Sequence, residues 1–187
     1  MKNFKLLNLL DSIAIFALTI MLVLAFEDQF TDHDLPCALC VMLRMGLYAM
    51  SYGLILNLTQ ARKQTHYLHV ILAATIEIII AAEFVVRHIV PGSGHYGDTI
   101  FGLHMYTWSL IASTIVLIYA TIAGLINGTT IQVAAKNNWV KYIIGFMLLT
   151  LCANIISTAM ECGPYSCPSD PSNYWLISKI HTYITHP

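Results

Sequence analysis

The sequence predicts an all-α integral membrane protein, built as one bundle of spanning helices. Of its 187 residues, 57% are hydrophobic and only 10% are charged, against about 25% charged residues in ordinary soluble domains. Five apolar runs approach the length of about 20 residues that a helix needs to cross the hydrocarbon core. The polar segments between these runs are short, which favours one compact bundle with hairpin connections.

The first apolar run could belong either to a signal peptide or to a spanning helix. It is longer than the usual apolar region of a signal peptide, about 7–15 residues, and no A-x-A-like cleavage site follows it, so we expect a span. No repeat, phosphate loop or basic stripe points to a further domain or to a nucleic-acid partner. We therefore expect a single membrane domain over residues 1–187, with spans at 6–26, 41–58, 68–90, 108–126 and 142–160 and a tail at 161–187.

The tail has the pattern of a short helix lying along the membrane surface. Pro168 to Ser172 contain turn and helix-start signals, and apolar and aromatic residues then recur at roughly helical spacing. Such a helix is too short to span and would place its aromatic rings at headgroup depth. The alternative is a frayed tail. The residues of this pattern are Tyr174, Trp175, Ile177, Ile180, Tyr183 and Ile184.

The basic residues predict how the chain is oriented, although the net charge is only −1. Six of the nine Lys and Arg residues lie before the first run or in the loops after the second and fourth runs. The opposite side holds only Lys179. Because basic residues collect on the cytoplasmic side, the N-terminus is expected in the cytoplasm and the C-terminus outside. The six residues are Lys2, Lys5, Arg62, Lys63, Lys136 and Lys141.

Two pairs of cysteines fall on the predicted outer side. Cys37 and Cys40 begin the second run, and Cys162 and Cys167 follow the fifth. A C-x-x-C motif alone fits a redox pair, half of a metal site or a structural disulfide. The topology did not use the cysteines, so their meeting on an oxidising face supports two disulfides of redox or structural use. Cys152, inside the fifth run, is expected to be a small buried apolar residue.

Arg44 lies one helical turn beyond Cys40, so the two side chains share a helix face. A guanidinium within the membrane is costly unless it reaches the headgroups or has a function. The functional interpretation is that Arg44 stabilises a thiolate at Cys40 and donates hydrogen bonds to a carbonyl oxygen of a bound cofactor. The alternative is an arginine that snorkels to the headgroups.

Other polar residues in the runs carry weaker predictions. Glu77, in the middle of the third run, has either a packing role or a proton-relay role. Glu83 and Arg87 are spaced to form an i, i+4 ion pair. Asp11 is expected to reach back to the cytoplasmic headgroups and has no assigned chemistry. His104 is either a proton shuttle at the interface or a structural residue.

The chain resembles the DsbB family of bacterial inner-membrane oxidases. The resemblance rests on the string from Pro36 to Cys40, on Arg44, and on the segment from Gly102 to Trp108, and it covers the first four runs. It implies a DsbB-like four-helix core and a membrane quinone, ubiquinone or menaquinone, as cofactor. It also implies that Cys37 and Cys40 form the quinone-proximal disulfide, with Arg44 beside the quinone head group.

In the family, a second cysteine pair accepts electrons from a periplasmic thioredoxin-like partner of the DsbA type. Here residues 91–107, where that pair normally lies, contain no cysteine. The fifth run instead brings Cys162 and Cys167 to the same side, and we expect them to take over the role. The predicted activity is that of a thiol:quinone oxidoreductase. The sequence does not indicate whether the partner attacks Cys162 or Cys167 first.

Three other interpretations compete with this one. The protein could be a quinone-linked oxidase of another substrate, or a reductase running in the opposite direction. It could be a metal or haem protein using Cys37, Cys40 and His88, although a closed zinc site requires four ligands and the outer pair lacks C-x-x-C spacing. It could also be a structural membrane protein with two inert disulfides.

Overall fold

Five long helices dominate the computed structural model, which describes residues 2–31, 37–89, 99–127, 138–163, 167, 174–176 and 179. All five are long and apolar enough to cross a membrane, which confirms the predicted all-α membrane bundle. Four helices extend beyond both ends of their predicted apolar runs, because the runs marked only the hydrocarbon-spanning part, whereas α3 begins four residues before its run and ends two residues short of it. The helices are α1 (Lys2–Thr31), α2 (Ala38–Thr59), α3 (Gln64–His88), α4 (Met105–Asn127) and α5 (Asn138–Cys162).

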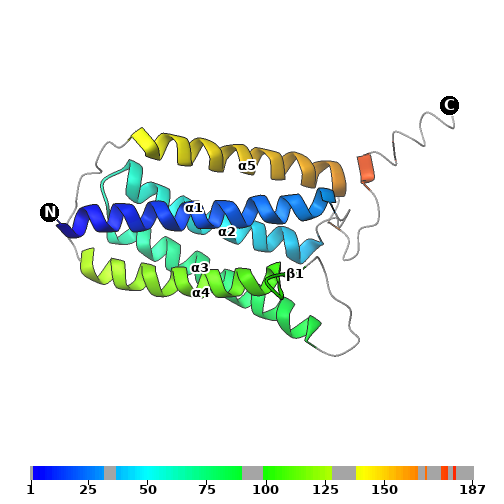
Figure 1. Ribbon diagram of the computed structural model, residues 1–187, viewed down its shortest axis with the longest axis horizontal. Helices are drawn as coiled ribbons and strands as arrows, with labels where there is room; N and C mark the ends of the chain where they lie inside the picture. The colour runs from blue at the N-terminus through cyan, green and yellow to red at the C-terminus, as the bar shows by residue number, and fades with distance from the viewer. Residues whose placement is uncertain are drawn as a thin grey trace.

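The five helices lie side by side and alternate in direction, so that α1, α3 and α5 run the same way (Figure 1). The central helices α2 and α3 pack against each other, α4 packs against α3, and α5 packs against α1 with further contacts to α2. The starts of α2 and α4 therefore lie at the same end as the last turns of α1, α3 and α5. We call this the cysteine end, because Cys37 and Cys162 are both there, and we call the other the N-terminal end.

A two-stranded hairpin that the sequence did not predict leads directly into α4. Its strands, β1 (Thr99–Ile100) and β2 (Leu103–His104), are antiparallel. The turn residues Phe101 and Gly102 have φ values of 54° and 79°, the left-handed conformation of primed hairpin turns. The Trp108 indole donates a 2.9 Å hydrogen bond to a carbonyl of β1 and holds the hairpin on α4. Strands of two residues are too short to show an alternating pattern in sequence.

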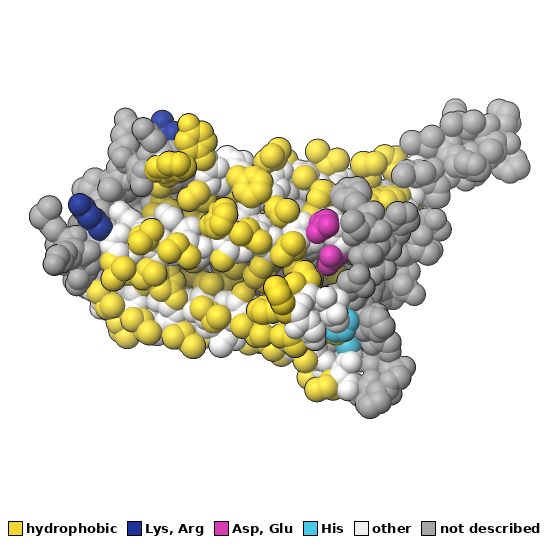
Figure 2. All heavy atoms as spheres, in the orientation of Figure 1, with side chains coloured by type: hydrophobic (Ala, Val, Ile, Leu, Met, Phe, Trp, Pro, Cys, Tyr) yellow, Lys and Arg dark blue, Asp and Glu magenta, His cyan; other side chains and the backbone are white. Residues whose placement is uncertain are grey.

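The outer surface of the bundle is apolar, as a lipid-facing surface must be. Large hydrophobic side chains such as Val86, Leu125 and Leu149 are more than half exposed. Figure 2 shows hydrophobic side chains along the whole length of one face, with Lys and Arg near the N-terminal end and Asp, Glu and His toward the cysteine end. On the face shown, this arrangement agrees with the charge asymmetry of the sequence.

Cys152 lies on that lipid-facing surface, so the expectation that it is buried was wrong. Its side chain is exposed on α5. Because α5 packs at the edge of the bundle, against α1 and α2, much of its surface remains outside the protein core. A small apolar residue suits contact with lipid as well as contact with a core, and sequence composition does not separate the two environments.

The predicted surface helix of the tail is not confirmed. Trp175 and Leu176 have helical backbone, and most of the remaining tail pattern lies outside the described residues. The described part folds back onto the bundle. The Trp175 ring packs on Gly163, where an added Cβ would come within 2.6 Å of the ring. The hydroxyl of Tyr174 accepts a 3.0 Å hydrogen bond from the amide of Gln29 in α1.

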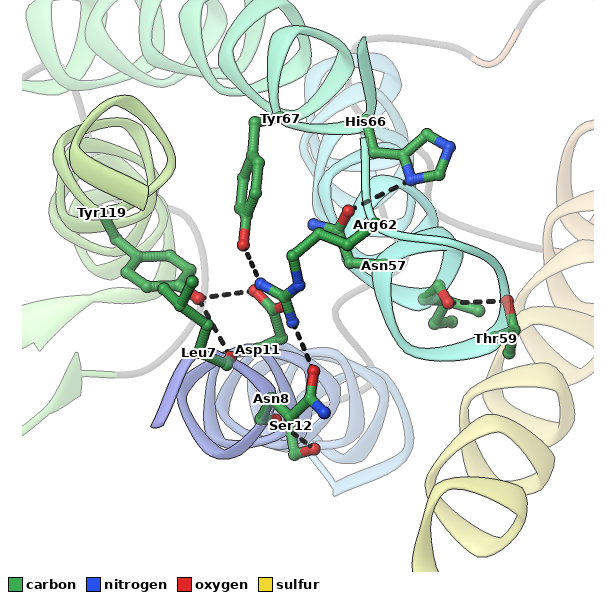
Figure 3. A network of polar contacts seen from close by, with 11 residues as sticks. Leu7, Asn8, Asp11, Ser12, Asn57, Thr59, Arg62, His66, Tyr67 and Tyr119 are labelled. Atoms are coloured by element: carbon green, nitrogen blue, oxygen red, sulfur yellow. Dashed lines mark hydrogen bonds and ion pairs between the residues drawn. The ribbon is translucent and has the colours of Figure 1, made fainter. Parts of the chain in front are cut away.

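A buried polar network joins four parts of the chain at the N-terminal end (Figure 3). Asp11 of α1 and Arg62, between α2 and α3, form an ion pair at 2.7 Å with both side chains fully buried. The guanidinium also donates hydrogen bonds to the Asn8 amide oxygen and to the Tyr67 hydroxyl. The Tyr119 hydroxyl of α4 donates to Asp11. The network therefore ties α1 to α3 and α4 within the bundle.

One expectation is corrected by this network, since Asp11 does not reach the headgroups. The connection between α2 and α3 is short, and it turns the Arg62 side chain inward to the level of Asp11 (Figure 3). Arg62 lies in the connection where the sequence placed it.

Glu77 bridges three helices in the middle of the bundle. Its side chain is fully buried, and one carboxylate oxygen accepts a 2.6 Å hydrogen bond from Ser109 of α4. The other oxygen lies against α2 at Gly46, where an added Cβ would be 1.9 Å away. Gly46 thus provides the space for the carboxyl group. These contacts favour the packing role over the proton relay.

The remaining predictions on α3 and α4 have simple outcomes. Glu83 and Arg87 form the predicted i, i+4 ion pair, and both side chains are largely exposed. The ring of His104 stacks on Tyr106 with 5.2 Å between centroids, which favours a structural role.

Candidate redox site

Cys37 and Cys40 lie at the first turn of α2, and both are free thiols in the structure. Cys37 is the N-cap residue, with an extended backbone, and its sulfur accepts a 3.2 Å hydrogen bond from the backbone N–H of Cys40. The first N–H groups of a helix have no partner within the helix and carry partial positive charge, so they stabilise an anion at this position. The Cys37 sulfur therefore lies where the N-terminus of the helix stabilises a thiolate most strongly.

Hydrogen bonds from Cys40, first from its thiol and then from its backbone N–H, lower the pKa of Cys37 from 9.0 to about 7, although burial opposes the shift. The expectation from sequence was a thiolate at Cys40. The structure stabilises it at Cys37 instead, because the cap position, rather than distance from Arg44 alone, decides which sulfur is stabilised.

The lowered pKa of Cys37 predicts how its reactivity changes with pH. Thiolate is present above pH 7 and is lost as the pH falls through about 7. Alkylation of the reduced protein by iodoacetamide, followed at Cys37 by mass spectrometry, should reach half its maximal rate near pH 7. A thiol with an unperturbed pKa would reach half its maximal alkylation rate at about pH 8.5.

Cys40→Ala provides the control, because it removes the thiol donor. In this variant the half-maximal pH for Cys37 should move upward. An unchanged value would show that the Cys40 thiol does not stabilise the Cys37 thiolate.

Arg44 is buried among three helices and does not snorkel, which excludes that alternative. Its side chain is only 8% exposed. It donates hydrogen bonds to the Gln29 amide oxygen of α1 at 3.1 Å, to the Asn154 amide oxygen of α5 at 2.9 Å, and to the backbone carbonyl of Ala25. The guanidinium thus joins the first turns of α2 to both α1 and α5.

A polar stripe on α5 contains the residues of that helix that pair with Arg44 and Gln29. Asn154, Ser157 and Glu161 are spaced to share one face of the helix. Asn154 also donates to the Tyr48 hydroxyl at 2.9 Å, and Ser157 accepts a 2.6 Å hydrogen bond from Gln29. Gln29 and this stripe were not predicted from the sequence. The regular spacing of three polar residues in an apolar run was the signal that could have revealed the stripe.

The second cysteine pair is joined by a disulfide between Cys162 and Cys167, which settles their pairing. Cys162 ends α5 and is almost fully buried. The structure thus brings all four predicted cysteines and Arg44 to one end of the bundle.

A cavity of about 310 Å³ lies between α2 and α5 and reaches both the arginine and the disulfide. Its volume is at the lower limit of the range for ligand pockets, about 300–1,000 Å³. Most of its lining is apolar, and Arg44 is the charged residue within it. The lining residues that matter for the site are Val41, Arg44, Tyr48, Asn154, Cys162 and Cys167.

The chemistry available at this cavity follows from its lining. A flat apolar molecule with a carbonyl oxygen could lie against the α2–α5 walls and accept a hydrogen bond from Arg44. Thiol–disulfide exchange requires only that one thiolate reach another disulfide, and both pairs lie at this end. Among the described residues, no group of three or more His, Cys, Asp or Glu side chains could hold a metal ion. The metal-protein interpretation therefore has no ligand set in that part of the chain.

Comparison with known proteins gives one match. The family model described as "Disulfide bond formation protein DsbB" matches residues 8–95, a segment that contains Cys37, Cys40 and Arg44. The match does not extend to α4 or to the segment from Gly102 to Trp108, on which the resemblance partly rested, and α5 with its disulfide also lies outside it. No curated protein and no solved structure matches the chain.

Proposed function

We propose that this chain, whose residues 8–95 match the family model of the disulfide bond formation protein DsbB, is a membrane thiol:quinone oxidoreductase of that family. It reoxidises a periplasmic thioredoxin-like dithiol protein of the DsbA type. Electrons pass from the Cys162–Cys167 pair to the Cys37–Cys40 pair and then to a membrane quinone, ubiquinone or menaquinone.

The observation that carries this proposal is the cavity between α2 and α5. It has apolar walls, one buried guanidinium, and the Cys162–Cys167 disulfide at its border. The apolar walls would hold a quinone ring, and Arg44 would donate a hydrogen bond to its carbonyl oxygen. Cys37 and Cys40 do not line the cavity; Val41 and Arg44, in the turn of α2 that follows them, do. When bound, a quinone supplies a two-electron, two-proton acceptor for the protein's thiols.

The protein's own residues perform the exchange steps. A thiolate of the partner attacks Cys162 or Cys167 and forms a mixed disulfide, which the second partner thiol resolves. The dithiol left at Cys162 and Cys167 then reduces the Cys37–Cys40 disulfide by the same chemistry. Arg44 stabilises negative charge on an oxygen in the cavity, and its effect is larger there than in water because the surroundings have a low dielectric constant.

The proposed location is a bacterial inner membrane, with the N-terminus in the cytoplasm and the cysteine end facing the periplasm. The excess of basic residues near the N-terminal end supports this orientation (Figure 2). An oxidising compartment at the cysteine end also suits the Cys162–Cys167 disulfide.

Quinone reduction by the purified protein tests this function directly. A reduced thioredoxin-like protein is the electron donor and a water-soluble ubiquinone analogue is the acceptor. We expect the wild type to turn over and Cys162→Ser to lose at least about 99% of the rate, because serine cannot form the mixed disulfide.

Cys152→Ser is the matched control, since this cysteine lies on the lipid-facing surface of the same helix. It should turn over like the wild type. Equal rates for Cys162→Ser and the wild type would remove the tail cysteines from the electron path. Absence of turnover in the wild type would refute the proposed function.

Arg44→Ala should chiefly raise the KM for quinone, by about tenfold, the effect of losing one charge-assisted hydrogen bond. The variant also leaves Gln29 and Asn154 without their donor, so its stability should fall. Asn154→Ala separates the two effects, because it loosens α5 but keeps the cation. An Arg44→Ala protein with unchanged KM would place the quinone elsewhere.

A further inference from the structure

Glu161, in the last turn of α5, is a buried carboxylate with no hydrogen-bond partner among the described residues. Its side chain is 2% exposed, and among the described residues neither carboxylate oxygen has a hydrogen-bond partner. A buried polar group with no hydrogen bond costs about 1–3 kcal/mol, and more if it is charged. Such a group in a folded protein calls for an explanation, and a catalytic role is one of the recognised ones.

Glu161 is next to one cysteine pair in the chain and interacts electrostatically with Cys37 of the other pair. It continues the polar stripe of α5 one turn beyond Ser157, toward the cysteine end, and it precedes Cys162 in sequence. The two charged or titratable groups that act on its carboxylate, Arg44 and Cys37, both come from the start of α2. The polar group that α1 contributes to the stripe, Gln29, is neutral.

Electron transfer between the two pairs must also move protons. In the balanced reaction, the dithiol of Cys162 and Cys167 becomes a disulfide while the Cys37–Cys40 disulfide becomes a dithiol. Two S–S exchanges carry two electrons, and the two protons released by the first pair are taken up by the second. Cys37 is 5% exposed and Cys162 is 6% exposed, so bulk water has little access to these two residues, whereas Cys40 and Cys167 are partly exposed.

We propose that Glu161 is the proton carrier between the two cysteine pairs. Its carboxylate accepts the proton of the thiol at Cys162 or Cys167 that attacks the Cys37–Cys40 disulfide. The carboxylic acid then returns that proton to the thiolate that leaves, at Cys37 or Cys40. This inference rests on the electron path of the proposed function, but not on the quinone.

A purely structural role for Glu161 makes a different prediction. Glutamine has almost the same volume and can accept and donate hydrogen bonds, but it cannot carry a proton. Glu161→Gln should therefore slow the transfer between the pairs by about a hundredfold, within the range found for general acid–base groups. If Glu161 had only a packing role, the substitution would leave the rate of transfer between the pairs unchanged.

The experiment follows the four cysteines separately, in the full-length protein and without quinone. The protein is oxidised with diamide and desalted, and then mixed with reduced thioredoxin as the electron donor. Samples are quenched with N-ethylmaleimide, and mass spectrometry counts the alkylated thiols at each pair with time. In Glu161→Gln, reduction of Cys162–Cys167 should proceed at the wild-type rate, whereas the appearance of thiols at Cys37 and Cys40 should be slow.

Glu83→Gln is the matched control, because Glu83 is an exposed glutamate near the cysteine end of α3 and should behave as the wild type. A second measurement needs no variant: in the wild type, the step between the pairs should be slower in D2O. Equal rates for Glu161→Gln and the wild type, or no solvent isotope effect, would overturn the proposal.

The outcomes also separate this inference from the proposed function. If electrons move between the pairs with the expected dependence on Glu161 but no quinone is reduced, the proton carrier stands and the proposed oxidase activity fails. If the wild type transfers no electrons between the pairs, both the carrier and the electron path are refuted.

Discussion

Cys40→Ser is expected to abolish thioredoxin-driven quinone reduction, and Cys37→Ser should have the same effect. Each transfer in the proposed path makes or breaks a sulfur–sulfur bond, and a serine oxygen cannot replace either sulfur. The loss should be complete within the sensitivity of the assay, because the Cys37–Cys40 pair is the step between the outer disulfide and the acceptor. The measurement is the decrease in quinone absorbance with purified protein in detergent.

The two variants should differ in the intermediate that they leave behind. Cys40→Ser keeps the Cys37 sulfur, which has the lowered pKa. It should accumulate a mixed disulfide between Cys37 and Cys162 or Cys167, visible as a cross-linked peptide in mass spectrometry. Turnover in either variant, with Cys152→Ser as the active reference, would exclude the C-x-x-C pair from the path.

Arg62→Ala should destabilise the bundle by about 3–5 kcal/mol, because it leaves Asp11 buried without its cation. Both side chains are fully buried, so water cannot replace the lost partner. The guanidinium also donates hydrogen bonds to Asn8 and Tyr67, and both residues lose this donor in the variant. The measurement is the unfolding of purified protein by SDS in mixed micelles, followed by circular dichroism.

Lys63→Ala is the control, because Lys63 is the next residue in the same connection and is exposed. It should change stability by less than about 0.5 kcal/mol. The double variant Asp11→Ala with Arg62→Ala should be less destabilised than the sum of the single variants, since neither charge is then left unpaired. An Arg62→Ala protein as stable as Lys63→Ala would mean that the ion pair contributes nothing to the fold.

Local features of the chain were sufficient to predict much of this structure. The apolar runs define five helices because a long hydrophobic segment has no other stable form in lipid. The spacing of Glu83 and Arg87 predicts their ion pair, since residues four apart are neighbours on any helix. The alternation of the spans also places both cysteine pairs at one end, whichever way the bundle lies in the membrane.

The pairing of polar side chains from different helices depended on which helix faces meet, and only the tertiary structure decided this. Arg62 lies far from Asp11 in sequence, and nothing local indicates that they pair. The partners of Arg44 on α1 and α5, Gln29 and Asn154, are 15 and 110 residues away from it in the chain.

The physical reason is that lipid and protein interior are both apolar. In a soluble helix the hydrophobic face identifies the buried side, but in a membrane helix the apolar residues of both faces look alike. The sequence by itself therefore determined the number of helices and the end at which the cysteines meet. The burial of Asp11, Arg62 and Glu161 and the exposure of Cys152 were decided by how the helices pack against one another.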